Sequence, residues 1–172
     1  MGRSPCRLPG VGHPLRLGGR DPDSGGSVGG MNTEDRPRHV NDPAVIRRLL
    51  RTPARWAVVG LTNNPGRVAP GVSRFVQDQL GMEVIPVSLS GESVLGNAGY
   101  RRLAEIPGHI DVVDCFVNSQ KVGDIVDQAI AVGAGAVWLQ LGVIDEAAAR
   151  RAKEAGLDVV MDTCPKMEYP YL

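Results

Sequence analysis

The chain has 172 residues, 42% of them hydrophobic, with 19 basic and 19 acidic side chains. This length suits one full-sized domain and is too short for two of ordinary size. Because the net charge is zero, no overall field attracts nucleic acid or an anionic membrane, and we expect neither as a partner. No apolar run approaches the roughly 20 residues that a membrane-spanning helix needs, which favours a cytoplasmic protein.

Cysteine and histidine are sparse and scattered. The three cysteines, Cys6, Cys115 and Cys164, form no CxxC pair, and their odd number argues against a disulfide framework. The three histidines stand apart and form no HExxH motif. We therefore expect no metal site.

The N-terminal stretch differs in composition from the rest. Its first 30 residues hold nine glycines and four prolines without apolar periodicity. Such a segment cannot bury enough apolar surface to offset its ordering entropy, so we predict a disordered tail over residues 1–36. A more ordinary sequence begins at Met31, and Met1 and Met31 are therefore both candidate starts of translation. The folded domain is expected over residues 37–172.

After the tail, helical and strand-like patterns alternate. Asp42 followed by Pro43 predicts the start of a helix, which Pro53 ends. Strands are predicted at 56–61, 83–88, 112–117, 136–141 and 158–162. Further helices are predicted after Pro70, around 100–105, over 121–132 and over 145–155, the last with Asp145 as N-cap and Gly156 as its stop.

Continuous apolar strands separated by amphipathic helices predict an α/β fold. The expected architecture is a doubly wound, Rossmann-like, parallel five-stranded sheet with helices on both faces, because parallel strands need crossover helices. In such sheets ligands bind outside the carboxyl ends of the strands. The candidate site therefore lies in the segments that follow the predicted strands.

The first of these segments has the pattern of a phosphate-binding loop. An apolar run stops at Gly60, passes through a loop rich in glycine, asparagine and proline, and continues as a helix. The GxGxxG fingerprint is absent, as is the Gly-Lys-Ser/Thr of a P-loop, and no carboxylate ends the second strand. Ordinary NAD binding is therefore disfavoured. Backbone N–H groups at the helix start, with Arg67 or Arg74, suit a generic anion.

Five segments in order, over about residues 43–172, resemble a known family. They are VVGLT (58–62), VIPV (84–87), VVDCF (112–116), AVWLQLGV (136–143) and VVMDTCPK (159–166). The resemblance is to the stand-alone CoA-binding proteins, which are similar to the CoA-binding domain of the succinyl-CoA synthetase alpha subunit.

The resemblance implies a coenzyme A or acyl-CoA ligand across the carboxyl edge of the sheet. The first loop would cradle the pyrophosphate, the second strand would line the adenosine side, and the last two segments would border the pantetheine arm. The residues implied are Gly60, Thr62, Asn63, Asn64, Arg67, Pro86, Val87, Phe116, Val117, Gln140, Leu141 and Gly142. The family often has arginine where Val117 stands, so one phosphate-pairing charge is missing, and Arg67 or Lys121 is a candidate to supply it.

The same resemblance bears on catalysis. Synthetase chemistry depends on a phosphorylated histidine in a second domain, which this sequence does not contain. We therefore predict non-catalytic CoA binding as a carrier, sensor or accessory protein, alone, as a homo-oligomer or with a partner enzyme. Two alternatives are the CoA-site subunit of a multi-chain acyl-CoA ligase or transferase, and an NAD(H)-binding regulatory domain. A weaker hypothesis gives Cys164 a role in thiol exchange, against the simpler one of a packed side chain.

Overall fold

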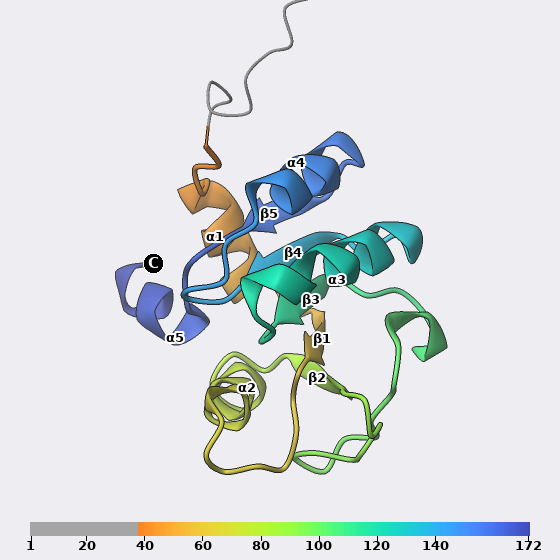
Figure 1. Cartoon of the computed structure of the whole chain (residues 1–172). Helices are drawn as coiled ribbons and strands as arrows, with labels where there is room; N and C mark the ends of the chain where they lie inside the picture. The colour runs from red at the N-terminus through yellow and green to blue at the C-terminus, as the bar shows by residue number, and fades with distance from the viewer. Residues whose placement is uncertain (1–37) are drawn as a thin grey trace, which may run out of the picture. The chain divides into compact units, whose positions relative to one another are not determined.

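A computed structural model describes residues 38–172 (Figure 1). The predicted tail, with the alternative start at Met31, lies outside the described residues, and both remain predictions. Among residues 38–172, no helix is both long and apolar enough to cross a membrane.

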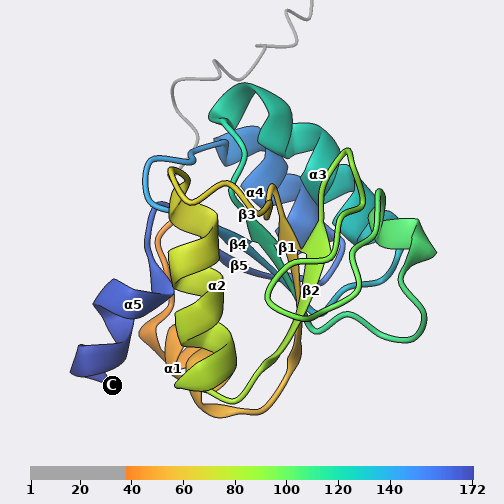
Figure 2. The same ribbon diagram turned by 90° about the horizontal axis from the view of Figure 1, so that it is seen from below.

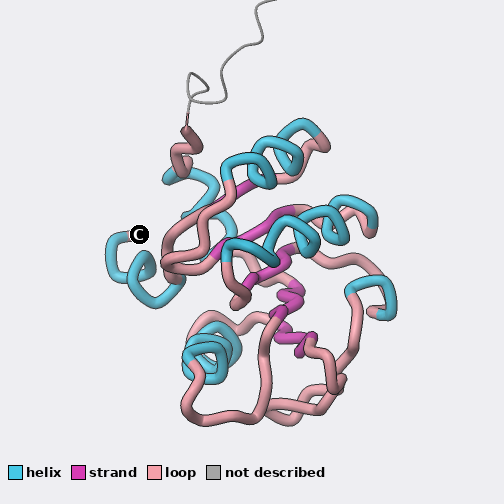
Figure 3. The backbone as a smooth tube through the Cα atoms, in the orientation of Figure 1, coloured by secondary structure: helices cyan, strands magenta, loops and turns pink. Residues whose placement is uncertain are grey.

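Five parallel strands form one sheet in the spatial order β2-β1-β3-β4-β5 (Figures 1 and 3). They are β1 (Arg55–Val59), β2 (Glu83–Val87), β3 (Val112–Cys115), β4 (Ala136–Leu139) and β5 (Asp158–Val160). The predicted fold class is confirmed. Each strand ends one or two residues before its predicted end. Of the apolar residues that follow the strands, Leu61 and Met161 are buried, Phe116 and Val117 are half-buried, and Leu141 is exposed.

Helices cover both faces of the sheet (Figure 2). On one face lie α1 (Pro43–Arg51) and α2 (Val68–Asp78), and on the other lie α3 (Ser119–Ala131) and α4 (Glu146–Glu154). Successive residues of a strand point to opposite faces, so Ala57 contacts the α3 side while Trp56 and Val58 contact the α1 side. Both faces of the sheet are therefore core.

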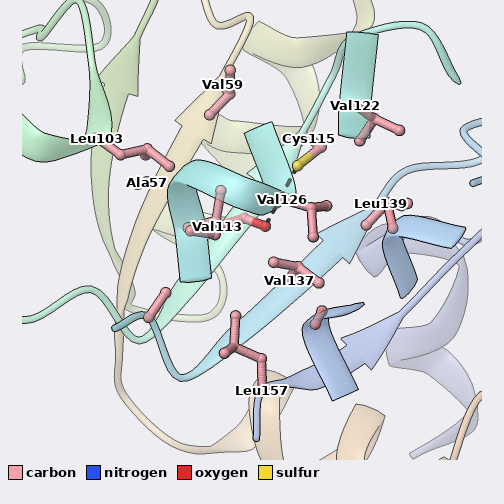
Figure 4. Close-up of a cluster of buried hydrophobic side chains, with 14 of the residues drawn as sticks. Ala57, Val59, Leu103, Val113, Cys115, Val122, Val126, Val137, Leu139 and Leu157 are labelled. Atoms are coloured by element: carbon pink, nitrogen blue, oxygen red, sulfur yellow. Dashed lines mark hydrogen bonds between the residues drawn. The ribbon is translucent and has the colours of Figure 1, made fainter. Parts of the chain in front are cut away.

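Two clusters of buried side chains make up that core. Figure 4 shows the cluster on the α3 side, where Val113, Cys115 and Val137 of the sheet lie beneath Val126 of α3. On the opposite side, the rings of Trp56 and Trp138 lie with their centroids 5.6 Å apart and are fully buried. Trp138 is thus a core residue and not a stacking platform for a ligand.

The predicted helix caps are confirmed. The Asp42 side chain accepts a hydrogen bond from the Ala44 N–H at 2.8 Å, and Asp145 accepts one from Ala148 at 2.9 Å. Gly156 ends α4 with φ of +87°, a conformation that glycine adopts without steric cost. These local signals are strong because each stabilises the helix end through neighbouring residues alone.

One helical prediction is wrong, and one short helix was missed. The helix predicted around 100–105 is only a 3-10 turn, Leu103–Glu105. Tyr100 is extended instead, because its N–H donates to the Pro86 carbonyl and its carbonyl accepts from the Ser88 N–H, at 2.9 and 3.0 Å. The short helix α5 (Pro165–Glu168) was not predicted at all. It leads into a 3-10 turn in which Tyr169 packs edge-on against Phe75 of α2, with ring centroids 5.7 Å apart.

Candidate functional site

The strand order makes the carboxyl ends of β1 and β3 the candidate site. These strands are neighbours, yet β1 leads into α2 on one face and β3 leads into α3 on the other. The two connections therefore diverge, which is the topological switch point where ligands bind in open α/β sheets. The predicted site residues belong to the strand ends and connections around this point.

Gly60 is required by the close approach of two backbones. Its φ is +92°, and its N–H donates to the Val87 carbonyl at 2.8 Å. A Cβ atom at this position would lie 2.8 Å from the carbonyl oxygen of Phe116. The glycine that was predicted to cradle a phosphate therefore also allows the ends of β1 and β3 to meet.

The loop after Gly60 is shaped by its two asparagines. The Asn63 backbone N–H and side-chain Nδ2 both donate to the carboxylate of Glu92, at 3.4 and 2.9 Å, and Nδ2 also donates to the Ser93 carbonyl. Asn64 accepts from the Gly66 N–H at 2.9 Å, an Asx turn. Both side chains hold the loop in shape. Sequence reasoning missed Glu92, because only the fold brings it to Asn63.

The start of α2 differs from the starts of α1, α3 and α4. Asp42, Asn118 and Asp145 cap those three helices with their side chains, but Arg67 at the N-cap of α2 makes no such bond. Pro70, third in the helix, has no N–H. The N–H groups of Val68 and Ala69 therefore lack a side-chain acceptor at the positive end of the helix dipole, beside the exposed Arg67 guanidinium.

Pro86 and Val87 lie within β2 and are buried, so the strand supplies the floor of this region rather than its rim. The rim at this strand is the connection that follows. There the hydroxyls of Ser88 and Ser90 are hydrogen-bonded to each other at 3.1 Å, and Leu89 is 97% exposed.

On the neighbouring strand, β3 is followed by Phe116 and Val117, both half-buried. The Phe116 N–H donates to the Val59 carbonyl at 2.9 Å, which extends the pairing of β1 with β3 beyond the ladder. Lys121 is exposed in the first turn of α3. Both side chains at the strand end are apolar, and Lys121 supplies a positive charge to this connection.

The connection after β4 combines a buried amide with an exposed apolar side chain. Gln140 is 5% exposed and its Nε2 donates to Oδ1 of Asp114 at 2.6 Å. Leu141 is 58% exposed at the rim. Gly142 has φ of +80°, and its N–H donates to the carboxylate of Asp162 at 2.7 Å. The Gln140 side chain thus supports the strand ends, while Leu141 faces solvent.

Asp114 is the most perturbed carboxyl group of this region. It is fully buried in β3, and burial raises its pKa to about 7, against the smaller opposing effects of the bonds from Gln140 and the Cys115 backbone. Its Oδ2 atom has no hydrogen-bond partner. A carboxyl group there is largely neutral in mildly acidic solution. Burial likewise raises the pKa of the adjacent Cys115 thiol, as expected of a core cysteine.

Cys164 precedes α5 and is half-buried against the α1-side core. The ammonium group of Lys166 lies over the Phe75 ring, 6.0 Å from its centroid. Among residues 38–172, no three metal-ligating side chains cluster in a way that could hold an ion.

Comparison with known proteins yields consistent matches. A family model described as "CoA binding domain" matches residues 54–170. The uncharacterized protein YneT of Bacillus subtilis is 36% identical over 126 residues, which cover 73% of this chain and 93% of YneT. A hypothetical protein from Pyrococcus horikoshii superimposes with a TM-score of 0.71 at 35% identity, covering 76% of this chain and 92% of that one.

A larger enzyme shares the fold. An acetyl-coenzyme A synthetase of Ca. Korarchaeum cryptofilum, solved with phosphate and ADP, superimposes with a TM-score of 0.60 at 22% identity. The match covers 72% of this chain but 28% of the synthetase. At this identity the likeness shows the fold alone.

Proposed function

This chain belongs to the family of CoA-binding domains, and from that premise we propose that it binds coenzyme A or a short acyl-CoA in the crevice between the ends of β1 and β3. The observation that carries the proposal is the start of α2. This helix lacks the side-chain cap that α1, α3 and α4 have, and it follows the Gly60 loop directly. An anionic pyrophosphate is the natural acceptor for such N–H groups.

In this arrangement each part of the ligand meets a suitable surface. The pyrophosphate accepts from the Val68 and Ala69 N–H groups and pairs with Arg67. The pantetheine arm runs along the apolar rim formed by Phe116, Val117 and Leu141. The asparagines of the first loop act by shaping it, since Asn63 is bonded to Glu92 and Asn64 to Gly66.

We propose that the role is non-catalytic, as a carrier, sensor or accessory protein. The histidines of the described chain lie away from the crevice. His39 lies just before α1. Asn41, two residues later, is hydrogen-bonded to the backbone of Met161, which follows β5. Strand β5 is at the edge of the sheet, and β3 and β4 separate it from β1. His109 lies 3.6 Å from Asp111, before β3 begins and so at the opposite edge of the sheet. Neither is placed to carry a phosphoryl group to a ligand at the switch point.

Isothermal titration of the full chain, stripped of bound nucleotide, tests the proposal. Coenzyme A and acetyl-CoA should bind, and NAD should not compete. Arg67→Ala should weaken CoA binding roughly tenfold, because a charge-assisted contact to phosphate is lost. Arg74→Ala removes the same charge two turns further along α2 and should change the affinity less than about twofold.

The outcomes separate the candidate functions. Absence of CoA and acyl-CoA binding would refute the proposal. Competitive binding of NAD or NADH in the same crevice would favour the dinucleotide alternative. Co-purification with an ATP-binding chain that forms acyl-CoA only in this chain's presence would instead favour a ligase subunit.

A further inference from the structure

One basic residue stands at the carboxyl end of β2, where the proposed site has no cation assigned. From Glu83 to Tyr100 the sequence contains no lysine or arginine, and Arg101 is the first. Although Arg101 lies 14 residues beyond the end of β2, the fold returns it to that strand end. Tyr100 pairs with Val87 in a parallel bridge, and its carbonyl accepts from the Ser88 N–H at 3.0 Å.

The stem of Arg101 lies directly over the connection that follows β2. A Cβ atom added to Gly91 would be 2.9 Å from Cγ of Arg101. The absence of a side chain at Gly91 lets the arginine stem pass over the loop. The backbone there is also fixed, because the Arg101 N–H donates to the carboxylate of Glu105 at 3.1 Å. The Arg101 side chain therefore leaves the backbone at a fixed position beside the connection that contains Ser88 and Ser90.

The charge of Arg101 is available to a ligand. Three other arginines, Arg48, Arg55 and Arg151, form ion pairs with Asp158, Glu83 and Asp127. Within residues 38–172 Arg101 forms none, and its side chain is exposed. The carboxylate of this connection, Glu92, accepts two hydrogen bonds from Asn63 and so is engaged on the side of the first loop.

We propose that Arg101 binds the phosphate on the ribose of the ligand and thereby makes the site selective for a 3′-phosphorylated nucleotide. The inference rests on the proposed function. In dinucleotide-binding sheets of this kind, the pyrophosphate sits at the first loop, the ribose lies at the end of the second strand, and an arginine nearby accommodates the 2′-phosphate of NADP. A ribose 3′-phosphate of coenzyme A would lie in the same neighbourhood if its pyrophosphate binds at the first loop. Arg67 and Arg101 then serve separate anions. Arg101 supplies a charge on the β2 side of the crevice, independent of the β3 side where Val117 stands.

The test compares CoA with 3′-dephospho-CoA, by titration calorimetry of the full chain stripped of nucleotide. The wild type should bind CoA more tightly, by roughly tenfold at low salt. Arg101→Ala should lose that preference, with CoA about tenfold weaker and dephospho-CoA changed less than twofold. Arg101→Lys should keep part of the preference, and added salt should weaken CoA binding to the wild type more than to Arg101→Ala. Arg47→Ala, which removes an exposed charge from α1, is the matched control and should change neither affinity.

Other results would overturn the inference in distinguishable ways. If the wild type binds CoA and dephospho-CoA equally, no ribose-phosphate subsite exists, although the proposed function stands. If Arg101→Ala weakens both ligands equally while its circular dichroism and melting temperature match the wild type, Arg101 acts elsewhere than at the 3′-phosphate. If the wild type binds neither ligand, the proposed function fails and this inference with it.

Discussion

The buried carboxyl of Asp114 should make the stability of this domain fall as the pH rises from 5 to 8. Burial raises the folded-state pKa of Asp114 to about 7 from its ordinary value of 3.8. Between these values the folded protein holds a proton that the unfolded chain has released. Unfolding is therefore increasingly favoured as the pH rises through this window, and the effect levels off above about pH 7.

The size of the effect follows from the two pKa values. A difference of about 3 pKa units corresponds to roughly 4 kcal/mol once both states are ionised. Between pH 5 and pH 8, the ionisation of Asp114 lowers the free energy of unfolding by roughly 2.5 kcal/mol. Asp114→Asn removes this dependence because the amide does not ionise. Its oxygen still accepts the bond from Gln140, and its amino group replaces Oδ2, which has no partner.

Urea unfolding of the wild type and Asp114→Asn, followed by tryptophan fluorescence at several pH values, measures the difference. The difference in stability should grow by roughly 2.5 kcal/mol from pH 5 to pH 8. The variant should be the more stable near pH 8, despite a cost of about 1 kcal/mol for the unpaired amide. Equal m values would show that both unfold by the same transition. Parallel stability profiles from pH 5 to pH 8 would refute the argument, because they would mean that Asp114 ionises alike in the folded and unfolded states.

Three substitutions test the backbone of the site and the helix caps. Gly60→Ala should cost about 2–3 kcal/mol, since φ of +92° strains any L side chain and the new Cβ would meet the Phe116 carbonyl at 2.8 Å. Gly71→Ala, a helical position with nothing within 4 Å, should instead stabilise by up to about 1 kcal/mol. If urea unfolding gave equal effects for the two glycines, the close approach of β1 and β3 would not be the cause. Asp145→Ala should cost about 1 kcal/mol through loss of the bond to Ala148, and an unchanged urea midpoint would contradict the capping role.

Several features of the site could be predicted from the sequence because they follow the chain locally. Gly60, the loop after it and the helix start at Arg67 are consecutive, and their pattern signals a strand, a turn and a helix in turn. Phe116 and Leu141 follow apolar runs, so their place at the carboxyl edge follows from the parallel sheet. The whole set lies at the strand ends, although Pro86, Val87 and Gln140 prove to be buried beneath the rim.

Other features required contacts between distant segments. Glu92 meets Asn63 across 29 residues, and Gln140 meets Asp114 across 26. Tyr100 and Arg101 return to the end of β2 because Tyr100 hydrogen-bonds that strand, an interaction that also converts a predicted helix into extended chain. No periodicity in the sequence carries this information, since hydrogen bonds of this kind depend on which segments the fold makes neighbours.

The sequence by itself determined the α/β class, the five strands and the caps at Asp42 and Asp145, since side-chain alternation and capping act over a few residues. Tertiary structure alone decided the strand order β2-β1-β3-β4-β5, and with it the position of the topological switch point between β1 and β3. That order depends on which face each crossover helix packs against. Each helix packs against the face of the sheet where its whole apolar surface is buried. This burial depends on the assembled core and not on any one segment.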